Sequence, residues 1–341
     1  DPSSQLSLAL PLELPPELYD YGSRSSGETH GVVLTKPHVV DLILDLVGYT
    51  PDQDLGDRCL LEPSCGAGAF LERALSRLIV SAVGHGRRLA DLQGALSAFD
   101  IDAAHVEASR RTLVRQLLAA GLSERDAVAL VTAWVRQGDF LLADQSLVDF
   151  VVGNPPYIRI EQLAPALQAE YRRRYPTLYD RADIYVAFIE RGLRLLKPDG
   201  VLGFICADRW TLNRYGAPLR ALIAKSFAVD CYIDLHDASP FESEVIAYPS
   251  IFVLTPGTSH DVPVVTLADA SPRECRVVSE HLRGPADPDG VRVERYQTWF
   301  AGEAPWILTG AAHVAALRGL EERWPTLEAE GATRVGIGVA T

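Results

Sequence analysis

The segment Asn154-Pro155-Pro156-Tyr157 combines an amide, two prolines and an aromatic ring, and it is the strongest candidate for a catalytic site in the sequence. It follows the apolar run 148–153, so we expect it at the end of a buried strand. Each proline lacks a backbone N–H, fixes its own φ and pushes the preceding residue toward extended geometry, which makes the turn stiff. The side-chain oxygen of Asn154 and the carbonyl of Pro155 then form a fixed pair of hydrogen-bond acceptors beside the ring of Tyr157. This arrangement suits a planar amino group as substrate; the alternative is a rigid connector after a strand.

A glycine-containing loop precedes this turn in the chain. Its sequence is Glu62-Pro63-Ser64-Cys65-Gly66-Ala67-Gly68, and it lies between an apolar strand pattern and a helical pattern. The glycines let a ligand approach the backbone, and the free N–H groups at the helix start face that ligand. A dinucleotide site would need a third glycine where this chain has Leu71, so a nicotinamide or flavin cofactor is disfavoured.

Two acidic residues stand after the next predicted strands. Asp100 is placed to accept hydrogen bonds from both hydroxyls of a ribose, whereas Asp102 fits better as a helix cap. Asp139 offers a carboxylate to an adenine amine, and Phe140 offers a ring to the purine face; taken alone, the pair is a turn with a core phenylalanine. The first strand is thus expected to bind a polar tail, the second a ribose and the third a purine. This combination fits S-adenosylmethionine better than any other nucleoside.

Parallel strands are needed to bring these motifs together, and the sequence predicts them. Helical stripes alternate with short buried strands, and this alternation favours an α/β fold with a doubly wound, mostly parallel sheet and helices on both faces. The predicted helices are 37–47, 70–79, 103–120 and 183–196, and the predicted strands are 59–61, 95–99, 148–152 and 201–206. Such sheets bind ligands beyond the carboxyl ends of their strands, which is where every motif falls.

The composition limits the classes of function. At 341 residues with 48% hydrophobic residues the chain can bury a large core, and it has neither a bilayer-length apolar stretch nor a signal-peptide layout at Asp1, so we expect a cytoplasmic protein without membrane partners. Its five cysteines form no C-x-x-C pair, which predicts neither a disulfide framework nor a metal site. The net charge of -13 requires any nucleic-acid contact to be local.

One basic cluster is a candidate for such a contact. Arg172, Arg173 and Arg174 follow the Asn154 turn, between Arg159 and Arg181, in an otherwise acidic chain. They predict contacts with DNA phosphates, and the alternative is a solvated helix face. Residues just past the next strand, including Arg209 and Arg214, are candidates for the same surface.

The sequence divides into three parts. Residues 1–30 are rich in Pro, Ser and Gly and predict an extended arm, and residues 31–260 contain all the motifs and predict the catalytic domain. Over 261–341 the pattern weakens into Pro- and Asp-rich connections and a helix at 311–327. The apolar, glycine-containing run Val335 to Thr341 is typical of a strand and turn cut short, so we expect a further domain to follow it.

With these motifs in this order, the chain resembles the class I S-adenosylmethionine-dependent methyltransferases. More specifically, residues 31–255 resemble the gamma-order adenine-N6 DNA methyltransferases of restriction-modification systems. Their amino-terminal motif is similar to the segment Gly31 to Pro37, apart from an inserted Lys36, and their catalytic motif matches Asn154 to Tyr157. The cofactor-binding residues that the resemblance implies are Thr35, Glu62, Ser64, Gly66, Gly68, Asp100, Ile101, Asp139 and Phe140.

The resemblance also implies a reaction and partners. It implies a seven-stranded sheet, S-adenosylmethionine as cofactor and double-stranded DNA as substrate, with an adenine flipped out and stacked on Tyr157 and Phe241. A target-recognition domain follows the catalytic domain in this group, and a restriction endonuclease, separate or fused, is the implied partner. The remaining alternatives are a methyltransferase for RNA bases or protein glutamine, and a non-catalytic nucleic-acid-binding subunit with the same fold.

Overall fold

The structure is a computed structural model that describes residues 34–243, 248–284, 291–308, 310–325 and 329. The predicted arm at 1–30, the start of the amino-terminal motif and the run 335–341 lie outside the described residues. Within the described part of the chain, the strands are β1 (Leu60–Glu62), β2 (Leu96–Asp100), β3 (Val135–Gln137), β4 (Val148–Gly153), β5 (Leu196–Ala207), β6 (Phe227–Asp234), β7 (Pro249–Pro256), β8 (Val262–Thr266) and β9 (Arg292–Tyr296).

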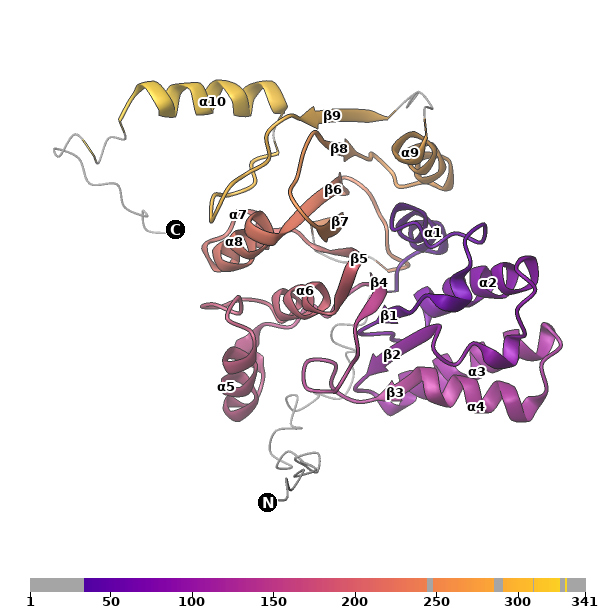
Figure 1. Ribbon diagram of the computed structural model, residues 1–341. Coiled ribbons are helices and arrows are strands. Elements are labelled where there is room, and N and C mark those ends of the chain that lie inside the picture. The colour runs from indigo at the N-terminus through magenta and orange to yellow at the C-terminus, as the bar shows by residue number, and fades with distance from the viewer. Residues whose placement is uncertain (1–33, 244–247, 285–290, 309, 326–328, 330–341) are drawn as a thin grey trace, which may run out of the picture.

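These strands form one nine-stranded sheet in the described residues, with the order β3-β2-β1-β4-β5-β7-β6-β8-β9 (Figure 1). The first five positions are joined in parallel, and β7 lies antiparallel between β5 and β6. Strand β8 pairs parallel with β6, and β9 pairs antiparallel with β8. The predicted fold class, a mostly parallel doubly wound sheet, is confirmed.

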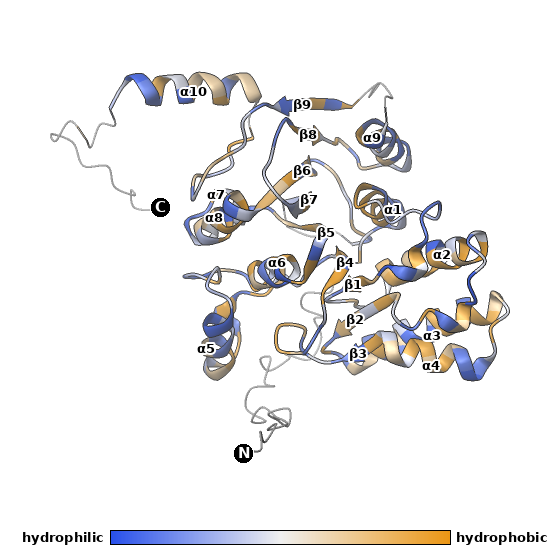
Figure 2. Ribbon diagram, viewed as in Figure 1, coloured by the Kyte–Doolittle hydropathy of each residue, from blue (hydrophilic) through white to orange (hydrophobic). Residues whose placement is uncertain are grey.

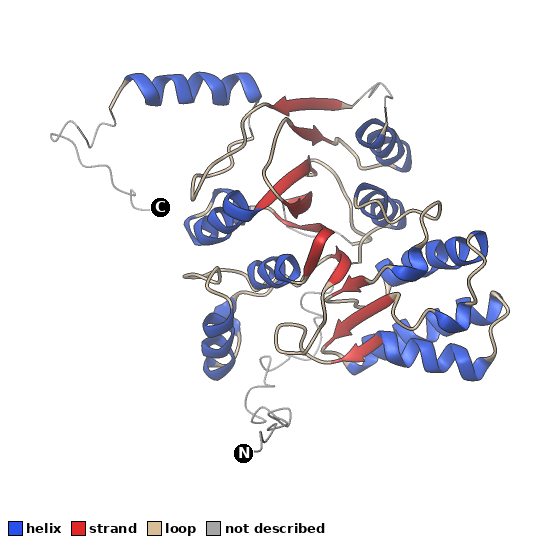
Figure 3. Cartoon of the chain, viewed as in Figure 1, coloured by secondary structure: helices blue, strands red, loops and turns tan. Residues whose placement is uncertain are grey.

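Helices cover both faces of this sheet (Figure 3). One face packs against α1 (Pro37–Leu46), α2 (Ala69–Gly84), α3 (Ala103–Ala119), α4 (Glu124–Trp134) and α9 (Pro272–Arg283). The other packs against α5 (Pro165–Arg174), α6 (Tyr185–Arg194), α7 (Arg209–Leu212), α8 (Ala217–Ser226) and α10 (Ala311–Arg323). The predicted helices at 37–47, 103–120 and 183–196 therefore exist, with ends that differ by up to two residues. None of the helices in the described ranges is long and apolar enough to cross a membrane.

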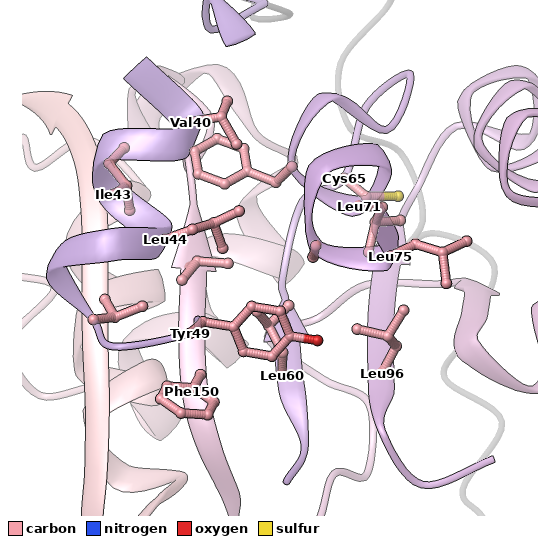
Figure 4. Packing of buried hydrophobic residues seen from close by; sticks show 14 of the residues in the cluster. Val40, Ile43, Leu44, Tyr49, Leu60, Cys65, Leu71, Leu75, Leu96 and Phe150 are labelled. Carbon is pink, nitrogen blue, oxygen red and sulfur yellow. The ribbon is translucent and has the colours of Figure 1, made fainter. Parts of the chain in front are cut away.

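The core on the first face follows from the apolar spacing of the helices. Figure 4 shows α1 and α2 side chains packed against Leu60 of β1 and Leu96 of β2, while the ring of Tyr49 meets Phe150 of β4 edge-on at 5.3 Å. Hydrophobic residues also run along the central strands, whereas α5 and α9 are mostly hydrophilic (Figure 2). The rigid centre of the sheet thus fixes where β1, β2 and β4 end.

The sheet is larger than the seven strands that the sequence predicts. Strands β8 and β9 continue it beyond residue 260, where the predicted catalytic domain ends, because Tyr232 of β6 pairs with Val264 of β8. Helix α9 closes over this extension: His38 bonds the Ala270 carbonyl at 2.8 Å, and Ser279 donates to Asp45 at 2.9 Å. The β8 strand is short and contains Pro263, so its periodicity alone is too weak to reveal it.

Candidate active site

The carboxyl ends of three neighbouring parallel strands define the site. Leu61 of β1 lies in register with Ser97 of β2 and Val151 of β4, so the residues that follow the three strands emerge at one edge. A pocket opens there among Leu34, Thr35, Glu62, Ser64, Cys65, Gly66, Ala69, Phe70, Asp100 and Asn154. It brings together predicted cofactor residues from the amino-terminal motif, the glycine loop and β2 with the asparagine of the predicted catalytic turn.

Backbone hydrogen bonds to β2 hold the glycine loop in shape. The Gly66 N–H donates to Asp100 Oδ2 at 2.8 Å, and the Cys65 N–H donates to the Phe99 carbonyl at 2.9 Å. Gly66 and Gly68 have φ values of 50° and 93°, which favour glycine. A Cβ on Gly68 would lie 2.9 Å from the Ser109 hydroxyl, so this turn has no room for a side chain. The loop is therefore shaped before any ligand binds.

Thr35 reaches the pocket because a distant segment pairs with it. Thr35 and Phe241 form an antiparallel bridge, which is flanked by bonds from the Lys36 N–H to the Pro240 carbonyl and from the Glu242 N–H to the Leu34 carbonyl, both 2.9 Å. The ring of Phe241 is only 5% exposed and belongs to the hydrophobic core on the α1 face. Phe241 thus supports the Thr35 segment, and the structure does not present its ring to the solvent.

Two polar atoms in the pocket have no hydrogen-bond partner among the described residues: Glu62 Oε2 and Thr35 Oγ1. Glu62 is 2% exposed, and burial, reinforced by the nearby Asp100 carboxylate, raises the pKa of its carboxyl group well above the usual value despite a bond from the Leu71 N–H. A buried carboxyl oxygen and a buried hydroxyl group that lack a hydrogen-bond partner cost free energy unless a ligand supplies the missing bonds. These two oxygen atoms fit a ligand with a polar, cationic end.

Asp139 lies beside the pocket, not in its lining. The Gly138 N–H bonds the Asp100 carbonyl at 2.9 Å, which ties this segment to the end of β2. Asp139 Oδ1 accepts from the Leu141 N–H at 2.8 Å, and Oδ2 accepts from the Tyr171 hydroxyl at 2.6 Å. Tyr171 comes from α5 and was not predicted, since no local pattern links residues so far apart.

Phe140 and Ile101 differ in exposure. Phe140 is 1% exposed and packs between Phe99 at 5.8 Å and Phe188 at 5.3 Å, with the Arg191 guanidinium 4.9 Å from its ring centroid. Ile101, which follows β2, is 38% exposed. Phe140 therefore reads as a core residue under the site, and Ile101 is free to contact a ligand.

The turn after β4 begins at Gly153, whose φ of 150° favours glycine. The Tyr157 ring is half-buried and meets the Tyr185 ring edge-on at 6.2 Å, and the Tyr185 and Tyr215 hydroxyls are 2.8 Å apart. The Tyr157 hydroxyl is buried without a hydrogen-bond partner in the described part of the chain, and this burial raises its pKa well above the usual value. Tyr157, Tyr185 and Tyr215 thus form a connected group, in which the sequence predicted a stacking role only for Tyr157.

The predicted phosphate-binding arginines on α5 are already engaged. Arg173 makes two bonds to Glu170 at 2.8 and 2.7 Å, and Arg174 bonds the same carboxylate at 2.6 Å, which holds the pKa of Glu170 down at about 2. Arg172 donates to the Asp180 carbonyl at 2.6 Å. Across the described residues, no group of three or more His, Cys, Asp or Glu side chains is placed to hold a metal ion.

Comparisons with known proteins agree with this geometry. Residues 120–241 match the Eco57I restriction-modification methylase family. The chain is 43% identical over 319 residues to the type II methyltransferase M.PaeR7I of Pseudomonas aeruginosa, covering 92% of this chain and 55% of that protein. It is 40% identical over 336 residues to M.BstVI of Geobacillus stearothermophilus, covering 94% of this chain and 60% of that one. The chain thus spans little more than half the length of these relatives.

Solved structures share the fold at low sequence identity. A protein from Listeria monocytogenes assigned to the class I S-adenosylmethionine-dependent methyltransferases matches with a TM-score of 0.50 at 18% identity, covering 72% of this chain and 70% of that one. A type I restriction-modification methyltransferase subunit from Streptococcus thermophilus matches with a TM-score of 0.53 at 15% identity, covering 87% and 54%.

The chain thus has the fold of the class I S-adenosylmethionine-dependent methyltransferases. Within that fold, the chain is similar to the Eco57I restriction-modification methylase family over residues 120–241, and to the type II methyltransferases over most of its own length.

Proposed function

We propose that this chain carries the cofactor-binding and methyl-transferring site of an adenine-N6 DNA methyltransferase of a restriction-modification system. The observation that carries the proposal is that Asn154 lines the same pocket as Thr35, Glu62 and Asp100. The Asn154 amide, next to polar groups that can bind a cofactor, suits the transfer of a methyl group to an amine. The type II relatives support DNA as the substrate class.

The cofactor would be held by residues already in place. Glu62 and Thr35 would take its amino-acid end, since each has a buried polar atom without a partner within the described ranges. Asp100, the last residue of β2, and Ile101 after it would take the ribose. Ser64 and Gly66 of the pocket lining would lie against the tail, and Gly68 would shape the same loop. Asp139 would accept from the adenine amine. Bound there, S-adenosylmethionine supplies an electrophilic methyl group.

Asn154 and Pro155 would act on the target amine. An adenine amino nitrogen is a poor nucleophile because its lone pair is delocalised into the ring. If the Asn154 side-chain oxygen and the Pro155 carbonyl accept the two N–H hydrogens, they favour a nitrogen whose lone pair is localised. Their positions are fixed by the two prolines and by Gly153, so this stabilisation is preorganised and largest in the transition state.

The target base would have to leave the duplex to reach Asn154. Unstacking costs a few kcal/mol, and the half-buried ring of Tyr157 would offset part of that cost by stacking on the base. Tyr185 and Tyr215 support the Tyr157 ring from behind. We assign no stacking role to Phe241, since its ring is in the core.

A methyl-transfer assay with labelled S-adenosylmethionine tests the function. Duplex DNA, RNA and protein are offered separately, and we expect label in DNA, recovered as N6-methyladenine after digestion. Label in RNA or in protein glutamine would favour the rival substrates, and cofactor binding without any transfer would favour a non-catalytic subunit.

Asn154→Ala tests the site. Transfer should fall by about 10² to 10³, the usual loss for one preorganised hydrogen-bonding group, while the calorimetric affinity for the cofactor stays within about twofold. Full transfer by this variant would remove Asn154 from the catalytic role.

A further inference from the structure

Two exposed arginines lie next to the base side of the site. Arg159 follows Tyr157 by two residues, and Arg209 begins α7 directly after β5. Neither guanidinium makes a hydrogen bond or a close ion pair within the described part of the chain. Both guanidinium groups are therefore available to a negatively charged ligand at this edge of the sheet.

The charges of both arginines act on the same residue, Asp183. Arg159 and Asp183 form an antiparallel bridge, and the bonds from Ile184 N–H to the Ile158 carbonyl and from Ile160 N–H to the Ala182 carbonyl hold the two segments together. The positive charges of Arg209 and Arg159 both act on the Asp183 carboxyl group, where burial is the larger influence and raises its pKa. Two cations thus act on a single carboxyl group.

The two arginines lie near the tyrosines that contact the Tyr157 ring. Tyr185, two residues after Asp183, packs against the Tyr157 ring and bonds Tyr215. Tyr215 follows the end of α7 by three residues, and the charges of Asp183 and Arg209 both act on its hydroxyl group. The two arginines therefore border the place where a flipped base would enter.

The arginines of α5 differ in this respect. Arg173 and Arg174 share the Glu170 carboxylate, and Arg172 is held by the Asp180 carbonyl. Binding a phosphate there would first have to break internal pairs. Arg159 and Arg209 make no hydrogen bond within the described residues that a phosphate would have to replace.

We propose that Arg159 and Arg209 bind the DNA backbone phosphates that flank the extruded nucleotide. The proposal rests on the proposed function and names its DNA-contact surface. Guanidinium groups bind phosphate oxygens through two parallel N–H bonds, and such contacts position the strand without reading its sequence. The two arginines fix where the sugar-phosphate chain runs, and Tyr157 receives the base between them.

The salt dependence of DNA binding tests the surface. The affinity of the full chain for duplex DNA is measured over a series of salt concentrations, for the wild type, Arg159→Gln, Arg209→Gln and the double variant. Each phosphate contact adds about 0.9 to the slope of log affinity against log salt. We expect each single variant to lower the slope by about 0.9 and the double variant by about 1.8.

Arg173→Gln is the matched control, because it removes the same charge from an exposed arginine that is paired with Glu170. Its slope should stay at the wild-type value. Slopes of the Arg159 and Arg209 variants that equal the wild type, or an equal decrease in Arg173→Gln, would overturn the proposal.

Failure of the proposed function is recognised separately. A wild-type chain that binds duplex DNA with a salt slope sensitive to Arg159 and Arg209, but transfers no methyl group to it, leaves the surface and removes the function. Normal methyl transfer, together with salt slopes that the variants leave unchanged, would support the function and reject the DNA-contact surface. Thermal melting of each variant checks that the fold is retained.

Discussion

The two sides of the pocket satisfy their polar groups differently. On the cofactor side, both oxygens of Asp100 accept backbone bonds at 2.8 Å, from Gly66 and from Asp102. On the base side, the Tyr157 hydroxyl and the Arg159 and Arg209 guanidinium groups have no hydrogen-bond partner within the described ranges. The cofactor side is therefore held by hydrogen bonds within the chain, whereas polar groups on the base side are available to a binding partner.

This difference has a physical consequence for the order of events. A preorganised loop loses little conformational freedom on binding a small ligand, so the cofactor side can bind tightly by itself. The base side gains most of its bonds only when a large polyanion arrives, so its contribution depends on salt and on the partner. The exceptions on the cofactor side are Glu62 Oε2 and Thr35 Oγ1, which we assign to the cofactor.

The largest effect on cofactor binding should come from Glu62→Gln. Burial and Asp100 raise the pKa of Glu62 above its usual 4.5, so the folded, ligand-free protein keeps a proton there that the unfolded chain has released. Stability therefore falls as the pH rises from 4.5 toward the raised pKa. A cationic ligand group favours the ionised form, so the cofactor should release a proton on binding and bind more tightly with rising pH in this range.

Calorimetry in two buffers of different ionisation enthalpy measures that proton. Glu62→Gln should abolish the proton release and weaken cofactor binding about tenfold, or about 1.4 kcal/mol. Glu72→Gln, on the exposed side of α2, is the matched control and should change neither quantity. Undiminished proton release in Glu62→Gln would assign the titration to another group and end the contrast for Glu62.

A smaller effect is expected at Tyr171. Its hydroxyl donates to Asp139 at 2.6 Å, so Tyr171→Phe removes one bond to a carboxylate that we assign to the cofactor's adenine while keeping the buried ring. Cofactor affinity should fall several-fold, about 1 kcal/mol, and the loss should vanish in an Asp139→Ala background. Both quantities are measured by calorimetry.

Tyr175→Phe is the control for this prediction. The Tyr175 hydroxyl bonds the Leu141 carbonyl at 2.5 Å, in the same segment and from the same part of the chain, but it does not touch Asp139. Equal losses of affinity in the two variants would mean that the segment is merely loosened, and Tyr171 would then have no specific role in positioning Asp139.

Local patterns explain which features the sequence could predict. The turn at Asn154 and the glycine loop are continuous segments whose backbone chemistry is written in their own residues, and helix periodicity predicted α1 and α3. The Glu170 pairing was also within reach, because Arg173 and Arg174 follow it by three and four residues on one helix. It weakens the predicted role of that cluster.

Other features depend on contacts that no local pattern encodes. The bridge between Thr35 and Phe241 and the bond between Tyr171 and Asp139 join residues that are brought together only by the finished sheet. Strand β8 pairs with the edge of β6, and β9 pairs in turn with β8. Side-chain direction at Phe140 was equally hidden, since a ring after a strand can face either a ligand or the core.

The smallest effect is expected for Tyr157→Phe. The Tyr157 hydroxyl is buried without a partner among the described residues, and removing such a group is neutral or stabilising as long as nothing else uses it. Methyl transfer to DNA should therefore stay within about twofold, and the melting temperature should hold or rise. Tyr157→Ala removes the ring as well, and the loss of base stacking should weaken DNA binding by about 1–3 kcal/mol. If the Phe variant loses as much as the Ala variant, bound DNA completes the hydroxyl's hydrogen bonding, and Tyr157 acts on the base through its oxygen as well as its ring.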